Sequence, residues 1–94
     1  MKNELSGMKA FVTVAELGSF SKAAEQLNLT QPALTKKIKK IEDNLNIALF
    51  ERTTRKIALT QAGKMLLPKA KALIASLDAA IFNLNDLTSQ IHDT

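Results

Sequence analysis

Residues 19–35 read SFSKAAEQLNLTQPALT, and this stretch predicts two short helices joined by a tight turn. Ser21 is a good N-cap for the first of them, which we expect over residues 22–27. Ala23 and Ala24 lie on its inner face, where small side chains let a second helix pack closely. The pattern is that of a helix-turn-helix, which DNA-binding proteins share with helical hairpins that bind no DNA.

The second helix of the motif is predicted to follow a turn at residues 28–29 and to run to about Asn44. Thr30 is its expected N-cap, and Pro32 falls in the first turn, where the missing N–H costs no hydrogen bond. At helical spacing, the stripe expected to face the core consists of Leu34, Ile38, Ile41 and Leu45.

The outer face of this helix is basic. It presents Pro32, Lys36 and Lys39, flanked by Ala33, Thr35 and Lys40. The lysines at 36, 37, 39 and 40 have no acid among them, whereas an exposed structural helix usually mixes Glu with Lys. Gln31 lies in the first turn, where a recognition helix meets base edges. The pattern favours DNA binding over the alternative, a solvated lysine-rich face.

A hairpin is predicted after the motif. Ile47–Phe50 and Ile57–Leu59 are short apolar runs typical of strands, and residues 51–56 form a polar connection between them. A hairpin beside a helix-turn-helix is a wing, which can contact phosphates or a minor groove. The cations available for such contacts are Arg52, Arg55 and Lys56. The alternative is an ordinary surface hairpin.

Further helices are predicted at both ends of the chain. Apolar residues at helical spacing indicate a helix over about residues 4–17, which Gly18 ends. Thr60 is expected to cap a long helix from Gln61 to about Ile91. An a/d heptad pattern runs through Ala70, Leu73, Leu77, Ala80, Leu84, Leu87 and Ile91. A second stripe, available to the domain body or to a partner, holds Leu67, Ile74 and Ile81. We therefore expect a coiled-coil dimer; the alternative is a helix that merely extends toward a further domain.

Positive charge is concentrated in the middle of the chain. The 94 residues carry 13 Lys/Arg and 9 Asp/Glu. Residues 22–71 hold eleven of the bases and four of the acids, whereas residues 72–94 hold three acids and no base. A focused basic patch indicates a polyanionic partner such as nucleic acid. The competing hypothesis is a helical dimerisation protein whose basic face is incidental, which predicts no affinity for DNA.

Several classes of function are excluded. Without cysteine, the chain has no disulfide, thiolate chemistry or Cys-ligated zinc. His92 is the single histidine, so no His-pair metal site is possible, and we expect neither enzyme activity nor a cofactor. No apolar run reaches the ~18 residues of a membrane span. Residues 1–7 lack the apolar core of a secretory signal, so a cytoplasmic location is expected.

Residues 19–35 resemble the helix-turn-helix of LysR-type transcriptional regulators, and the match extends in order and spacing over about residues 5–70. The supporting positions are Ile38, Ile41-Glu42, Leu45, Leu49-Phe50-Glu51-Arg52, Arg55 and Leu59-Thr60-Gln61-Ala62-Gly63. The resemblance implies a mainly α fold, with a winged helix-turn-helix of three helices and a two-stranded wing in residues 1–60. A linker and dimerisation helix would follow in residues 61–94. It also implies a bacterial homodimer that binds specific DNA sequences.

The resemblance assigns roles to individual residues. In this family the recognition helix, here about residues 31–44, enters the major groove, and a homodimer binds an imperfect inverted repeat. The base-reading set would be Gln31, Pro32, Ala33, Thr35 and Lys36. DNA backbone contacts would come from Ser21, Lys22, Thr30, Lys39 and Lys40. The wing would contribute Arg52, Thr54, Arg55 and Lys56. The dimer seam would consist of Ala70, Leu73, Leu77, Ala80, Leu84 and Leu87.

The chain departs from the family pattern at several positions. Asn46 stands where glycine is usual, but Asn tolerates a left-handed backbone, so we expect the turn to persist. Thr35 replaces a common serine, Lys36 a frequent arginine, and Thr54 and Lys56 the usual wing glycines. Family members also carry a C-terminal effector-binding domain and often form tetramers. These 94 residues lack that domain, and we expect them to be a fragment of such a regulator.

Overall fold

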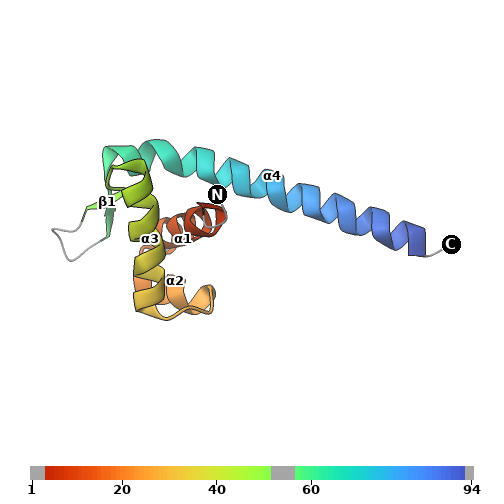
Figure 1. Ribbon diagram of the computed structural model, residues 1–94, viewed down its shortest axis with the longest axis horizontal. Coiled ribbons are helices and arrows are strands. Elements are labelled where there is room, and N and C mark those ends of the chain that lie inside the picture. The colour runs from red at the N-terminus through yellow and green to blue at the C-terminus, as the bar shows by residue number, and fades with distance from the viewer. Residues whose placement is uncertain (1–3, 52–56, 93–94) are drawn as a thin grey trace.

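The computed structural model describes residues 4–51 and 57–92 of the chain. Its elements in order are α1 (Glu4–Leu17), α2 (Phe20–Gln26), α3 (Gln31–Leu45), β1 (Phe50–Glu51), β2 (Ala58–Leu59) and α4 (Gln61–His92). The first three helices and the two strands gather at one end, and α4 projects from them as a long arm (Figure 1). The molecule measures 58 × 25 × 21 Å because of this arm.

The core lies between α1, α2, α3 and the start of β1. Phe50 links these elements, because its ring centroid lies 5.4 Å from that of Phe11 in α1 and 5.8 Å from that of Phe20 in α2. Tilted and edge-on ring pairs of this kind are favourable. From α3, the predicted stripe contributes the buried side chains of Leu34, Ile38 and Ile41.

One member of the predicted α3 stripe is not buried. Leu45 is 47% exposed. It is the last residue of α3, and the chain turns at Asn46 before Leu45 can meet another element. The prediction that Leu45 belongs to the core was therefore wrong.

The N-cap of α2 also differs from the prediction. Ser19, not Ser21, caps the helix: its Oγ accepts the N–H of Lys22 at 3.1 Å. The left-handed backbone of Gly18 (φ 63°) ends α1 as predicted, and Ser19 then adopts the extended conformation that a cap requires. Because α2 begins at Phe20, Ser21 lies inside its first turn.

Both ends of α3 follow the expectation. The Ala33 N–H donates to Thr30 Oγ1 at 3.2 Å, so Thr30 is the N-cap, and Pro32 lies in the first turn. At the other end Asn46 is left-handed (φ 58°), as predicted for an asparagine in a glycine position. Asn28, in the turn before α3, has the same left-handed conformation.

The hairpin is shorter than the predicted strands. In the described part of the hairpin, antiparallel pairing joins Phe50 to Leu59 and Glu51 to Ala58. Ile47 was predicted to belong to the first strand, but its N–H donates to the Glu42 carbonyl at 3.1 Å. That bond makes Ile47 part of the turn that closes α3, so it cannot pair with β2.

The long helix starts at the base of the hairpin. Thr60 caps it as predicted, because Thr60 Oγ1 accepts the Gly63 N–H at 3.1 Å. Early in the helix, Leu67 and Ile74 pack against the core. Beyond this contact, α4 extends away from the body (Figure 1).

Candidate nucleic-acid interface

The exposed face of α3 brings most of the predicted base-reading residues together. A shallow hollow of about 530 Å³ on this face is lined by Gln31, Pro32, Thr35, Lys36 and Lys39. A second hollow, of about 270 Å³, is lined by Ala33, Lys36, Lys37 and Lys40. Since the two hollows share Lys36, they form one continuous basic surface, and no acid lines either of them.

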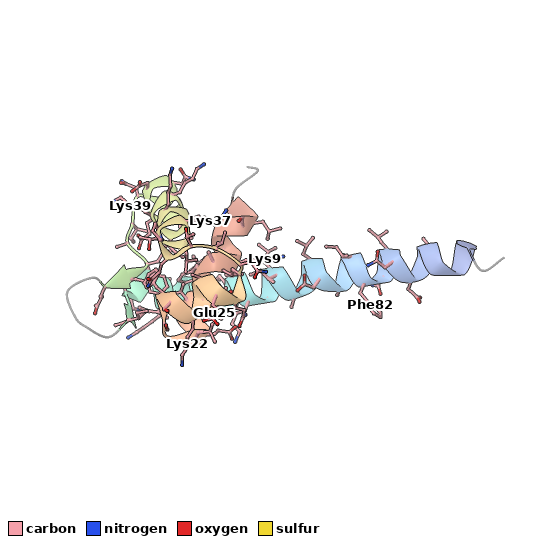
Figure 2. The ribbon with its side chains drawn as sticks, turned by 90° about the horizontal axis from the view of Figure 1, so that it is seen from below. Lys9, Lys22, Glu25, Lys37, Lys39 and Phe82 are labelled. Atoms are coloured by element: carbon pink, nitrogen blue, oxygen red, sulfur yellow. The ribbon has the colours of Figure 1, made fainter. Side chains whose placement is uncertain are left out.

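Two lysines of α3 differ in their surroundings. Lys39 is exposed, and Figure 2 shows it at the outer side of the helix. Lys37 is half-buried, and its Nζ donates to Ser6 Oγ of α1 at 2.9 Å. Lys37 therefore joins α3 to α1, and its charge lies at the edge of the basic surface.

The predicted backbone contacts divide into two groups. Thr30, Lys39 and Lys40 are exposed on or beside α3, next to the hollows. Ser21 and Lys22 are exposed at the N-terminus of α2, and Figure 2 shows Lys22 pointing away from the side that carries Lys39. The structure thus does not bring this second group onto the basic surface of α3.

The wing is described only at its base. Its predicted DNA contacts Arg52, Thr54, Arg55 and Lys56 lie outside the described residues. The base itself, β1 and β2, follows directly from the C-terminal turn of α3.

No role was predicted for Glu42, which the structure shows to be a buried acid. Glu42 lies on α3 and is only 9% exposed. Its Oε2 accepts the N–H of Leu49 at 2.7 Å and that of Phe50 at 3.2 Å. The signal in the sequence was a pair of acids, Glu42 and Asp43, at the end of a lysine-rich helix, but spacing does not reveal the partners of Glu42.

The predicted dimer seam is largely accessible on α4. Exposed or half-buried positions are Leu73, Leu77, Ala80, Leu84 and Leu87. Ala70 is the exception: it is 2% exposed and belongs to the core of the same chain, so its assignment to the seam was wrong. It satisfies the heptad pattern but faces the domain body.

A large aromatic side chain on α4 was not predicted to be functional. Phe82 is 70% exposed and projects from the arm (Figure 2). At about 100° per residue, it lies on the face of α4 opposite Leu84 and Leu73. It is therefore outside the predicted seam.

Metal binding and membrane crossing each require features of their own. Within the described ranges, no group of three or more His, Cys, Asp or Glu side chains is placed to hold a metal ion. No helix in that part of the chain combines the length and apolar character that a membrane crossing needs.

Comparison with known proteins gives a consistent result. A family model described as "Bacterial regulatory helix-turn-helix protein, lysR family" matches residues 5–64. The uncharacterized HTH-type transcriptional regulator YbhD of Escherichia coli K12 is 58% identical over 89 residues, which are 95% of this chain and 28% of YbhD. The HTH-type transcriptional activator AllS of Salmonella typhimurium is 44% identical over 86 residues, 92% of this chain and 27% of AllS. The chain thus spans little more than a quarter of either regulator.

Solved structures that are similar to this chain include complexes with DNA. The BenM DBD with catB site 1 DNA has a TM-score of 0.86 and 34% identity, covering 92% of this chain and 97% of that one. Vibrio fischeri DarR with DNA has a TM-score of 0.84 and 34% identity, covering 92% of this chain and 30% of DarR. The winged helix-turn-helix followed by a long helix is common to all three.

Proposed function

Since the chain belongs to the lysR family of bacterial regulatory helix-turn-helix proteins and forms a DNA-binding domain of that family, we propose that it reads an operator as a homodimer. Two copies joined through α4 would place their α3 helices in successive major grooves of an imperfect inverted repeat. The observation that carries this proposal is the basic surface of α3, on which the side chains proposed to read bases and bind phosphates line two adjoining hollows.

The residues that we propose to read bases lie in the first two turns of α3. Gln31 can form two hydrogen bonds to an adenine, and Lys36 can donate to the acceptors of a guanine, each worth about 1–3 kcal/mol of discrimination. Thr35 can offer its methyl group to a thymine. The neighbouring Pro32 and Ala33 shape the surface that meets the base edges.

Backbone binding surrounds this base-reading set. Lys39 and Lys40 extend the basic surface along α3 toward the phosphates. Thr30 Oγ1 accepts the Ala33 N–H, which leaves the hydroxyl proton available for a phosphate oxygen. Ser21 and Lys22 would contact a separate stretch of backbone. The wing residues Arg52, Thr54, Arg55 and Lys56 would bind flanking DNA.

Dimerisation is supported by the exposed side of α4. Leu73, Leu84 and Leu87 are large apolar side chains that stand exposed on the arm. A contiguous apolar stripe of this kind marks an interaction surface, and its a/d spacing suits a helix of a second copy. In a regulator of the length of YbhD or AllS, such dimers would associate further into tetramers.

The proposed cellular location follows from the proposed DNA partner. We place the protein in the bacterial cytoplasm, where its DNA lies. Its relatives YbhD and AllS are transcriptional regulators. We propose accordingly that the chain regulates transcription without catalysing a reaction and without a cofactor.

Fluorescence anisotropy tests the proposal. A labelled duplex carries an inverted repeat, with T and A bracketing each dyad, and is compared with a scrambled duplex over a range of salt. We expect tighter binding to the repeat and a steep loss of affinity with salt, because Lys contacts release counterions from the phosphates. Absence of binding at low salt would instead favour a dimerisation protein with an incidental basic face.

A further inference from the structure

Glu42 is a buried acid that the proposed DNA contacts do not use. It lies in the last turn of α3, beyond Lys36 and Lys39, and its carboxylate is buried in the protein. Its Oε2 accepts the backbone N–H groups of Leu49 and Phe50. Glu42 thus joins the recognition helix to the residues that begin β1.

The same short segment is held from its other side by the start of α4. The Thr60 N–H donates to the Leu49 carbonyl at 3.0 Å, and Thr60 Oγ1 donates to the Ala48 carbonyl at 2.7 Å. Residues 48–50 are therefore bonded to α3 by Glu42 and to the β2–α4 junction by Thr60. Both sets of bonds help to hold the base of the wing in a fixed relation to α3.

The hairpin cannot supply this relation by itself. Among the described residues, two pairs join β1 to β2, and an isolated two-stranded hairpin is at best marginally stable. Burial of Leu49 and Phe50 anchors the segment in the core, but hydrophobic burial is non-directional. Hydrogen bonds are directional, and bonds to a carboxylate are short and strong. The carboxylate of Glu42 thus directs the strand as it leaves α3, together with the bonds that Thr60 makes to residues 48 and 49.

We propose that Glu42 is a positioning residue for DNA binding, which orients the base of the wing relative to the recognition helix so that both contact one duplex. This role rests on the proposed function, in which the wing binds flanking DNA. Glu42 touches no DNA itself. It acts through Leu49 and Phe50, and its loss should remove the contribution of the wing while leaving base reading by α3 intact.

A double-mutant cycle tests the proposal in the 94-residue chain. Glu42→Met keeps the length of the side chain and removes the acceptor, and Glu42→Gln is the conservative control that retains one acceptor oxygen. Each is combined with Arg55→Ala, and affinity for the inverted-repeat duplex is measured over a range of salt. Thermal unfolding of every variant shows whether it is folded at the assay temperature.

We expect Arg55→Ala to weaken binding by the wild-type chain and to lower its salt slope by about 1. In the Glu42→Met background, Arg55→Ala should change affinity by less than about twofold, which is the limit within which independent sites are additive. Glu42→Gln should restore most of the Arg55→Ala effect. Preference for the inverted repeat over scrambled DNA should persist in Glu42→Met.

Equal losses from Arg55→Ala in the wild-type and Glu42→Met backgrounds would overturn the positioning role while leaving the proposed function standing. Arg55→Ala without effect on the wild-type chain would also overturn it, since there would be no wing contact to position. A wild-type chain that does not prefer the repeat would overturn the proposed function itself. If Glu42→Met is unfolded, Glu42→Asp, whose carboxylate is one methylene short of its partners, decides the cycle in its place.

Discussion

Gly63 of α4 lies directly against the backbone carbonyl of Leu49, so closely that no Cβ fits between them. The contact brings the first turn of the long helix onto the residues that begin the wing. Since the obstructing atom is a backbone oxygen, a side chain at position 63 cannot be accommodated by a rotamer change.

Gly63→Ala should therefore destabilise the domain by about 1–3 kcal/mol, as overpacking does elsewhere. The expected result is a fall of several degrees in Tm for a domain of this size. Thermal unfolding followed by circular dichroism measures it, with Ala75→Ser on the exposed side of α4 as the control. An unchanged Tm in Gly63→Ala would show that α4 can move away from Leu49 at no cost.

The cap of α2 gives a second prediction, because two nearby serines have different surroundings. Ser19→Ala removes the acceptor for the Lys22 N–H and should cost about 0.5–2 kcal/mol of stability. Ser21→Ala, inside the first turn, should leave stability within about 0.5 kcal/mol of the wild type. Urea unfolding compares the two. If Ser21 makes the proposed phosphate contact, its variant should lose DNA affinity at unchanged stability.

Helix ends were the most predictable part of the fold. Gly18, Thr30, Asn46 and Thr60 were all assigned correctly from the sequence, because a cap satisfies backbone groups only a few positions away. Ser19 was missed although the rule was right. Two serines near the start of α2 could both serve, and the choice depends on how the chain leaves Gly18.

Residues whose environment depends on distant elements were predictable only in part. Ala70 fits a heptad seam, but periodicity does not distinguish a face that meets a second copy from one that meets the domain body. Leu45 is the last residue of α3 and Ile47 follows it, and both apolar side chains are about half exposed. Whether such residues are buried depends on where α3 ends and β1 begins, which the sequence pattern did not define.

In the candidate site, too, residues with a local pattern were predictable and a residue with distant partners was not. The outer face of α3 was predictable because helical spacing alone separates Lys36 and Lys39 from the core stripe. The role of Glu42 was not, because its partners belong to another element, seven and eight positions along the chain. A tertiary hydrogen bond of this kind has no local pattern.

The third prediction is that different residues of α3 contact bases and phosphates. Gln31→Ala should lose about 1–3 kcal/mol of discrimination at one base pair while keeping most affinity for scrambled DNA. Lys40→Ala should weaken binding to every sequence and lower the salt slope by about 1, because a phosphate contact carries no sequence information. Anisotropy titrations against single-base-pair variants of the repeat measure both. Equal effects of the two substitutions on all duplexes would contradict this assignment.

The arm offers a matched pair of substitutions for the proposed dimer. Leu84 and Phe82 are both large, apolar and exposed, at 63% and 70%, but they lie on opposite faces of α4. Both are far along the arm from the domain body, so a charge at either position leaves the core intact. Leu84→Asp places that charge in the predicted seam, and Phe82→Asp places the same charge outside it.

Leu84→Asp should therefore shift the sedimentation coefficient toward the monomer, because pairing would bury an unpaired carboxylate against leucines. It should weaken binding to a duplex with two half-sites far more than binding to a single half-site. Phe82→Asp should change neither property. If Phe82→Asp alone dissociated the dimer, the second copy would have to contact the opposite face of α4, and the heptad through Leu73 and Leu84 would be only a solvent-exposed stripe.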